Sequence, residues 1–255
     1  MSALQITVTP ADGLIDEPRR IVASGAEPGE IIEITAQTQR SGVTWQAHAS
    51  FRAGANGRID LTTDEALEGT YTGIDGMGLV WSQSPVNSKS RELFNSPVTD
   101  ALITTISARG KGCPQPPAVA TLTQRVAGEG VTRREVREDG LVGTLYLPAG
   151  DGPHPAVMIL NGSGGGINEH RAALYASRGY AAFALAYFKA PGLSDYISNT
   201  PLEYFQKGMQ WLRKTVQPKN DFVAINGQSR GGELVLLLGA TFPQDVNAVI
   251  AYVPS

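Results

Sequence analysis

The chain has 255 residues, of which 42% are apolar and 18% charged, and its 21 basic and 24 acidic residues give a formal net charge of -3. The charged share lies below the roughly 25% of average proteins, which excludes a disordered or strongly solvated chain. The sequence lacks a basic cluster of the kind that follows a phosphate backbone, so nucleic acid is not an expected partner. A chain of this length is expected to form two domains with substantial cores.

The first 110 residues predict short strands separated by turn residues. In the clearest strand, Val43, Trp45 and Phe51 belong to an apolar series that alternates with polar residues. This alternation places His48 on the solvent-exposed face of the strand. Several such strands without a helical period predict an all-β immunoglobulin-like sandwich over residues 1–110. The predicted strands are 5–10, 19–25, 30–39, 43–53, 57–63, 69–75, 78–84 and 101–110.

A Pro-rich stretch, KGCPQPP at residues 111–117, interrupts this pattern. Pro-rich segments form semi-rigid connections, so we assign residues 111–125 to a linker. Cys113, the one cysteine of the chain, excludes an internal disulfide and has no nearby cysteine or histidine with which to form a metal site or a redox pair. The sequence therefore predicts neither a cofactor nor a metal.

The N-terminus MSALQITVTP has no basic region followed by an apolar region, as a secretion signal would have. No apolar run reaches the ~18 residues that a membrane span requires. We therefore expect a cytoplasmic protein with no membrane span.

From residue 126 onward, predicted strands alternate with predicted helices. This alternation is typical of a parallel sheet with helices on both faces. The helix at 202–216 is preceded by Thr200, which stands three residues before Glu203, the spacing of a capping box. Leu202, Phe205 and Met209 share the apolar face of this helix. The other elements are predicted at 144–147, 156–160, 181–187, 222–225 and 246–253 for strands, and at 169–178 and 232–241 for helices.

A G-x-S-x-G pentapeptide, GQSRG, stands at residues 227–231 with Ser229 at its centre. The apolar strand predicted at 222–225 leads directly into the pentapeptide, and the apolar helix predicted at 232–241 follows it directly. This context predicts a nucleophile elbow, a sharp turn that exposes the serine hydroxyl above the sheet. The alternative is a Gly-rich turn in which the serine caps the helix, and the two apolar flanks favour the elbow.

Acyl transfer to a serine also needs N–H donors for the oxyanion that forms on attack. The amide of Arg230 is one by position, since it follows the nucleophile and opens a helix. The Gly-rich loop at 161–166 follows an earlier strand, and we expect the amide of Ser163 or Gly164 to be the second donor. A phosphate site is the alternative, but the loop lacks the Lys-Ser/Thr of a P-loop and the G-x-G-x-x-G spacing.

Segments of both predicted domains resemble the family of acyl-CoA thioesterases and bile acid-CoA:amino acid N-acyltransferases. In the first half these are PADGLIDEP at 10–18 and GIDGMGLVW at 73–81. In the second half they are LNGSGGG at 160–166, AYF at 186–188, PLEYF at 201–205 and GQSRGGELVLLL at 227–238. The resemblance extends over nearly the whole chain and implies a sandwich domain followed by an α/β-hydrolase domain. It also implies attack by Ser229 on an acyl thioester, with a small-molecule acyl-CoA or ester as the ligand.

The transferase branch of that family uses a cysteine nucleophile, and its thioester intermediate is captured by amines more readily than an oxygen ester is. Ser229 therefore favours hydrolysis, so the sequence predicts a serine hydrolase that cleaves acyl thioesters. Carboxylesterase activity and acyl transfer to an amine remain alternatives.

In an α/β-hydrolase the acid and the histidine of the triad follow the serine along the chain. All three histidines, His48, His154 and His170, precede Ser229, and we expect each at the surface. Asp245 comes before a strand, whereas the family's acid follows a later one, so Asp245 is not assigned that role. We therefore expect residues 126–255 to be the N-terminal part of an incomplete α/β-hydrolase domain, with the acid and the histidine beyond Ser255.

A serine without a base is a weak nucleophile, so we expect this chain to be weak or inactive. A hypothesis of a different class is a non-catalytic fragment that binds an acyl ligand or a partner chain. Such a fragment would bind its ligand equally well after Ser229→Ala.

Overall fold

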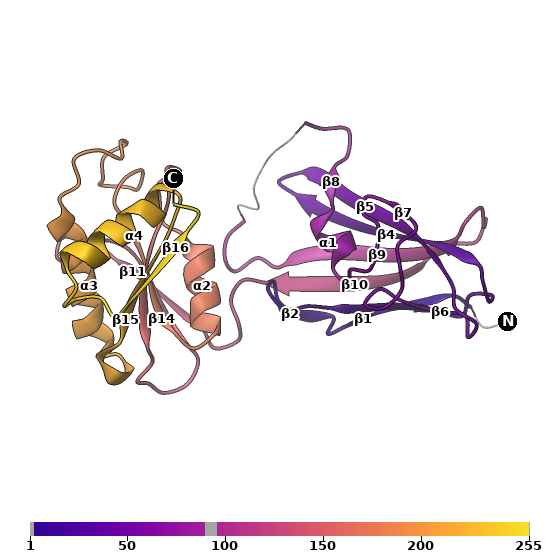
Figure 1. The fold of residues 1–255 in the computed structure, drawn as a ribbon, viewed down its shortest axis with the longest axis horizontal. Coiled ribbons are helices and arrows are strands. Elements are labelled where there is room, and N and C mark those ends of the chain that lie inside the picture. The colour runs from indigo at the N-terminus through magenta and orange to yellow at the C-terminus, as the bar shows by residue number, and fades with distance from the viewer. Residues whose placement is uncertain (1–2, 90–95, 255) are drawn as a thin grey trace. The chain divides into compact units, whose positions relative to one another are not determined.

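The computed structural model describes residues 3–89 and 96–254. The chain divides into two compact units, Met1–Arg125 and Val126–Ser255 (Figure 1). The first unit contains mainly strands, whereas strands and helices alternate in the second. Within the described ranges, no helix is long and apolar enough to cross a bilayer.

The first unit consists of two sheets. The smaller has the order β1-β3-β6, formed by β1 (Gln5–Thr9), β3 (Arg20–Ser24) and β6 (Arg58–Asp60). The larger has the order β2-β10-β9-β4-β5-β7, with β8 also paired to β5. Its strands are β2 (Asp12–Leu14), β4 (Ile31–Arg40), β5 (Val43–Arg52), β7 (Glu68–Gly69), β8 (Ser84–Pro85), β9 (Leu102–Gly110) and β10 (Ala118–Arg125). Neighbouring strands run antiparallel except β2 and β10.

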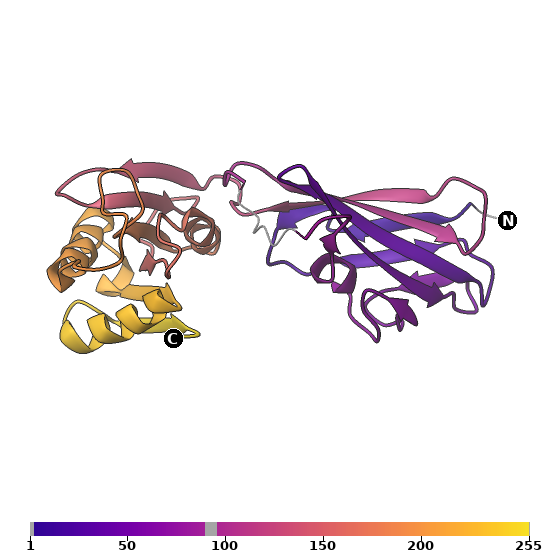
Figure 2. The same ribbon diagram turned by 90° about the horizontal axis from the view of Figure 1, so that it is seen from above.

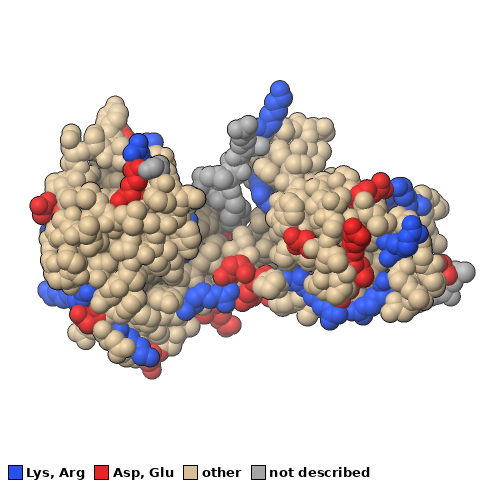
Figure 3. All heavy atoms as spheres, in the orientation of Figure 1, with Lys and Arg blue, Asp and Glu red and all other residues tan. Residues whose placement is uncertain are grey.

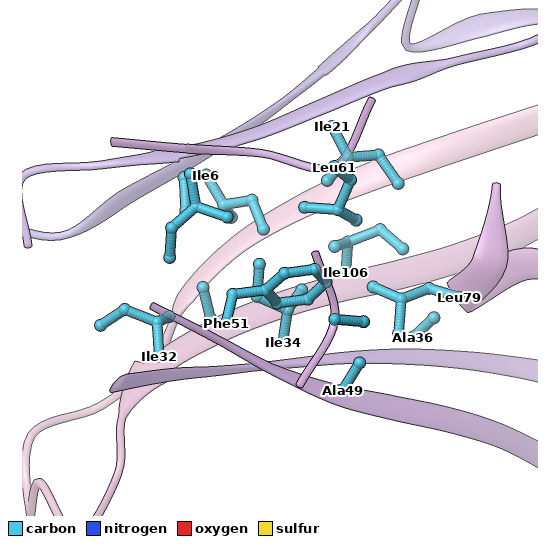
Figure 4. Packing of buried hydrophobic residues seen from close by; sticks show 14 of the residues in the cluster. Ile6, Ile21, Ile32, Ile34, Ala36, Ala49, Phe51, Leu61, Leu79 and Ile106 are labelled. Carbon is cyan, nitrogen blue, oxygen red and sulfur yellow. The ribbon is translucent and has the colours of Figure 1, made fainter. Parts of the chain in front are cut away.

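Buried apolar side chains from both sheets form one core between them (Figure 4). Ile6 and Ile21 come from the smaller sheet, and Ile34, Phe51 and Ile106 come from the larger. Alternate residues of β4 and β9 are buried, as expected for strands with one face on a core. The predicted antiparallel sandwich is confirmed.

Several elements of the first unit differ from the sequence prediction. The strand predicted at 69–75 is reduced to Gly69, the last residue of β7, and an isolated bridge at Gly73, and β2 is not among the predicted strands. Residues 118–125, predicted to belong to the linker 111–125, form β10 and pair along their length with β9. Leu122 and its alternate neighbours face the core, a period that the Pro-rich segment before it obscures. Residues 78–84, predicted as a strand, contain the helical turn α1 (Gly78–Trp81), which buries Leu79. A Cβ at Gly78 would collide with the ring of Tyr71.

The second unit contains a six-stranded sheet in the order β11-β12-β14-β13-β15-β16. Its strands are β11 (Thr132–Val136), β12 (Val142–Leu147), β13 (Ala156–Leu160), β14 (Ala181–Ala186), β15 (Val223–Gln228) and β16 (Ala248–Tyr252). The pairs β11–β12 and β12–β14 are antiparallel, and the other pairs are parallel. The strand β11 is not among the predicted strands, because its sequence TRREV exposes four residues and buries one.

Three helices cover this sheet, and a short 3-10 turn spans Lys219–Asp221. The helix α2 (Glu169–Ser177) lies on one face, and α3 (Leu202–Val216) and α4 (Arg230–Thr241) lie on the other (Figures 1 and 2). Every residue of β13 and β14 is buried, because both faces of the sheet are covered. The predicted α/β-hydrolase class is confirmed.

The start of α3 corrects one detail of the prediction. Pro201 occupies the N-cap, with no side-chain cap hydrogen bond, so Thr200 and Glu203 do not form a capping box. The Thr200 hydroxyl instead donates to the carbonyl oxygen of Tyr187 at 3.5 Å. The predicted apolar face of α3 is confirmed, since Phe205 and Met209 are buried.

Candidate active site

Ser229 occupies the turn between the end of β15 at Gln228 and the start of α4 at Arg230. Its backbone has φ 54° and ψ -125°, a conformation that is uncommon for a residue with a side chain. Such strain costs on the order of 1–3 kcal/mol and clusters at functional sites. The serine side chain forms no cap hydrogen bond to the helix, so the capping alternative is wrong.

The two outer glycines of the pentapeptide are needed for close backbone approach. A Cβ at Gly227 would collide with the carbonyl oxygen of Gly231. A Cβ at Gly231 would lie 2.5 Å from the carbonyl oxygen of Asn161, at the end of β13. Both distances are too short for a real side chain, which explains why small residues stand at these two places.

The Gly-rich loop after β13 lies directly against this turn. A Cβ added to Gly162 would lie 3.3 Å from the Cβ of Ser229 and 2.8 Å from the carbonyl oxygen of Gln228. The structure therefore brings the loop at 161–166 beside Ser229, although the two are far apart in the sequence.

Hydrogen bonds fix the shape of this loop. The amide of Gly165 donates to the Gly162 oxygen at 3.0 Å, and the Asn161 amide group donates to the Gly165 oxygen at 2.6 Å. The Tyr187 hydroxyl donates to the carbonyl oxygen of Asn161 at 2.8 Å.

The amides that the sequence assigns to the oxyanion hole lie in this loop and at the start of α4. Within the described residues, the amides of Ser163 and Gly164 form no hydrogen bond, and both residues are exposed. The amide of Arg230 opens α4, where the first N–H groups have no carbonyl one turn earlier to bond. These three amides are available to an oxyanion, and their role stays a prediction.

A polar cluster that sequence reasoning missed supports the strand below Ser229. Arg171 of α2 donates to the side-chain oxygen of Gln228 at 2.6 Å and to that of Asn226 at 3.2 Å. Its guanidinium also lies over the ring of Tyr252, 5.2 Å from the centroid. Asn226 is fully buried, so its amide group needs such partners. Only Gln228 of this cluster belongs to the pentapeptide, and no local pattern marks the other residues.

Glu169, the first residue of α2, binds the neighbouring strands. Arg133 donates two hydrogen bonds to its carboxylate, at 2.9 and 2.8 Å. The hydroxyl groups of Tyr146 and Thr144 donate two more, at 2.6 and 3.0 Å. The Arg133 hydrogen bond, with the hydroxyl donors, lowers the pKa of Glu169 to about 2 against the opposing effect of burial. Glu169 is thus a fixed anion that attaches α2 to the sheet.

The histidines do not complete a triad with Ser229. Among the described residues, the Ser229 hydroxyl forms no hydrogen bond with an imidazole or a carboxylate. His154 precedes β13, whereas Ser229 follows the parallel strand β15. His154 therefore lies at the N-terminal ends of the parallel strands and Ser229 at their C-terminal ends. His48 is exposed as predicted, whereas His154 and His170 are only partly exposed. The Nε2 atoms of both are buried.

Asp245 is buried and joins α3 to the segment before β16. Its carboxylate accepts a hydrogen bond from Gln206 at 2.8 Å and lies 3.8 Å from the guanidinium of Arg213. Because β15 and β16 are parallel, Asp245, which precedes β16, also lies at the N-terminal ends of the strands, opposite the end that carries Ser229. Its contacts agree with leaving it out of the triad.

In the described part of the chain, no group of three or more metal-ligating side chains gathers.

Surface charges are mixed in sign. Arg125 pairs with Asp12 in the first unit, and Arg230 pairs with Glu233 beside Ser229. Figure 3 shows acidic and basic side chains next to one another at several places on the face drawn. The Arg230 side chain is thus held by Glu233 on the first turn of α4.

Comparison with known proteins identifies two family regions. The acyl-CoA thioester hydrolase/BAAT N-terminal region matches residues 16–138, and the BAAT/acyl-CoA thioester hydrolase C-terminal region matches residues 200–255. Together the two regions cover more than two thirds of the chain.

Curated relatives agree with this assignment. Acyl-coenzyme A amino acid N-acyltransferase 2 of Rattus norvegicus is 34% identical over 259 residues, covering 99% of this chain and 62% of the relative. Acyl-coenzyme A thioesterase 2, mitochondrial, of Homo sapiens is 34% identical over 239 residues, covering 92% of this chain and 49% of the relative. The chain thus spans about half to three fifths of these relatives. It belongs to the acyl-CoA thioester hydrolase/BAAT family.

Proposed function

We propose that this chain carries the nucleophile and the oxyanion donors of a serine hydrolase that cleaves acyl thioesters, with acyl-CoA as the substrate. The observation that carries the proposal is the strained turn at Ser229, between a buried parallel strand and the start of α4. The Gly-rich loop against that turn supports it. The names of the relatives, an acyl-CoA thioesterase and an acyl-CoA amino acid N-acyltransferase, supply the substrate class.

The chemistry follows from the placement of these groups. The Ser229 oxygen attacks the thioester carbonyl carbon, and the resulting oxyanion accepts hydrogen bonds from the amide of Arg230 and that of Ser163 or Gly164. The carbon–sulfur bond then breaks, and the thiol leaves with the proton from the serine. A water molecule attacks the acyl-enzyme, releases the carboxylic acid and restores the serine hydroxyl.

The rate is expected to be limited because no base lies beside Ser229 among the described residues. A serine hydroxyl without an adjacent base is a poor nucleophile, and no described imidazole is hydrogen-bonded to Ser229. We therefore propose that the 255-residue chain turns over slowly, because the oxyanion donors act without general-base assistance.

Thiol release from a panel of acyl-CoA esters tests this function. We expect slow release that Ser229→Ala abolishes, whereas the matched serine variant Ser198→Ala in an exposed loop retains it. Addition of glycine distinguishes hydrolysis from transfer, since transfer yields the acyl-glycine amide in place of the acid. Release that persists in a folded Ser229→Ala variant would overturn the assignment of the nucleophile.

A further inference from the structure

A cavity of about 150 Å³ lies among β14, α3 and α4 of the second unit. Tyr187, just after β14, and Ile197, in the following loop, line one part of it. Leu202 and Phe205 of α3 and Arg230 and Leu234 of α4 also line it.

Two of these lining residues connect the cavity to the proposed active site. Arg230 is the residue directly after Ser229. Tyr187 donates a hydrogen bond to the carbonyl oxygen of Asn161, at the start of the loop whose Gly162 lies against Ser229. The cavity thus borders the turn after β15, and Tyr187 links it by a hydrogen bond to the loop after β13.

The lining offers no unpaired charge. The Arg230 guanidinium is 2.9 Å from the Glu233 carboxylate. The Tyr187 hydroxyl is engaged with Asn161, and burial raises the pKa of Tyr187 to about 12, so this phenol stays neutral. The remaining lining residues are the apolar Ile197, Leu202, Phe205 and Leu234, and Thr200, whose hydroxyl donates to the carbonyl oxygen of Tyr187 at 3.5 Å. A neutral apolar group fits such a surface, because burying an unpaired charge there would be costly.

The volume limits what this group is. Apolar cavities of about 150 Å³ lined by Leu, Ile and Phe hold a molecule the size of benzene. We propose that this cavity, which is open to solvent, binds the acyl chain of the thioester attacked by Ser229 and buries no more than about six of its carbons. This inference rests on the proposed function and adds a limit on chain length to it.

Leu234 is the residue best placed to set this limit. It follows Arg230 by four positions on α4, so the two side chains share one face of the helix. Leu237 offers a matched control on the same helix, since it is 50% exposed and does not line the cavity. Leu234→Ala enlarges the cavity and Leu234→Trp fills it, whereas Leu237→Ala leaves it unchanged.

The test measures binding without turnover. The probes are S-(2-oxoalkyl)-CoA thioethers of increasing chain length, which keep a carbonyl group but have no cleavable thioester bond. Calorimetry with the full 255-residue chain gives the dissociation constants. Each buried methylene contributes about four-fold in affinity, so we expect the affinity to rise four-fold per carbon up to about six carbons and then stop rising.

The variants decide whether this cavity is responsible. Leu234→Ala is expected to move the limit to longer chains, Leu234→Trp to shorter ones, and Leu237→Ala to leave it unchanged, with circular dichroism confirming that each folds. Affinity that rises steadily to twelve carbons, a limit that moves equally with Leu237→Ala, or no binding at any length would overturn the inference. A limit that shifts at Leu234 in a chain whose Ser229 releases no thiol would overturn the proposed function and leave the acyl pocket standing.

Discussion

Arg171 on α2 donates a hydrogen bond of 2.6 Å to Gln228, the residue directly before Ser229. The same guanidinium reaches the buried Asn226 at 3.2 Å. Since α2 begins shortly after the Gly-rich loop, this one side chain joins the element that follows the loop to the strand that carries the serine. The two halves of the proposed site are therefore fixed to each other by Arg171, a residue that lies outside both motifs.

Replacing Arg171 with Met tests this connection. The substitution leaves the buried Asn226 oxygen without its charged donor, which costs about 1–3 kcal/mol. We expect the free energy of unfolding in urea to fall by that amount. Lys207→Met, on the exposed part of α3, is the control and is expected to change it by less than about 0.5 kcal/mol. Equal effects of the two variants would contradict the role of Arg171.

Gly162→Ala tests the close approach of the loop to the serine. The added Cβ would lie 2.8 Å from the Gln228 oxygen and 3.3 Å from the Ser229 Cβ, so backbone must move. Overpacking of this kind costs roughly 1–3 kcal/mol. Gly164→Ala, two residues later, places its Cβ in open space and is the control for stability. We expect thermal denaturation to show a lower midpoint for Gly162→Ala, and a midpoint lowered equally by both variants would contradict this packing.

Glu169 predicts a pH dependence of stability. Its pKa is lowered to about 2 in the folded chain, first by the Arg133 hydrogen bond, from an ordinary value of 4.5. A carboxyl group with a depressed folded pKa stabilises the fold fully above its unfolded pKa, and this contribution is lost as the pH falls toward the folded value. We expect Glu169→Gln to lower the free energy of unfolding at pH 7, with the difference from the parent chain shrinking between about pH 4.5 and 2.

Urea denaturation at several pH values measures that difference. Glu203→Gln, an exposed acid on the first turn of α3, is the matched substitution. A gap between the parent chain and Glu169→Gln that stays constant down to pH 2 would show that Glu169 does not titrate as the structure indicates.

Replacing Asp245 with Ala tests whether its carboxylate has a structural or a catalytic role. Its carboxylate is bound by Gln206 and Arg213 at the N-terminal ends of the parallel strands, opposite the end that carries Ser229. We expect Asp245→Ala to cost about 1–3 kcal/mol of stability, because it leaves buried donors without an acceptor. Thiol release from acyl-CoA, measured where the variant is fully folded, is expected to stay unchanged. Loss of release in the folded variant would give Asp245 a catalytic role.

The parts of the site that the sequence predicts are local. The pentapeptide around Ser229 and its two apolar flanks are contiguous, so their period and composition show the strand, the turn and the helix together. The loop at 161–166 follows from the alternation of strands and helices, since parallel strands carry their following loops to one edge of the sheet. Both predictions depend on short-range patterns that few other arrangements satisfy.

The parts that could not be predicted are contacts between polar residues far apart in the chain. Arg171 with Gln228, and Glu169 with Arg133, are ordinary surface residue types until the fold brings them together. The strand β10 was hidden because a Pro-rich segment precedes it, and β11 because four of its five residues are exposed. The half-buried state of His154 depends on the packing around the start of β13, which no sequence period records.

Trapping the acyl group tests the central claim most directly. The 255-residue chain is incubated with a short acyl-CoA, quenched in acid and digested, and the peptide that contains residue 229 is weighed by mass spectrometry. We expect the mass of this peptide to increase by one acyl group on Ser229. The increase is expected to be absent from Ser229→Ala and present in Ser198→Ala. An acyl group found on another residue, or an unmodified Ser229 peptide while thiol is being released, would contradict it.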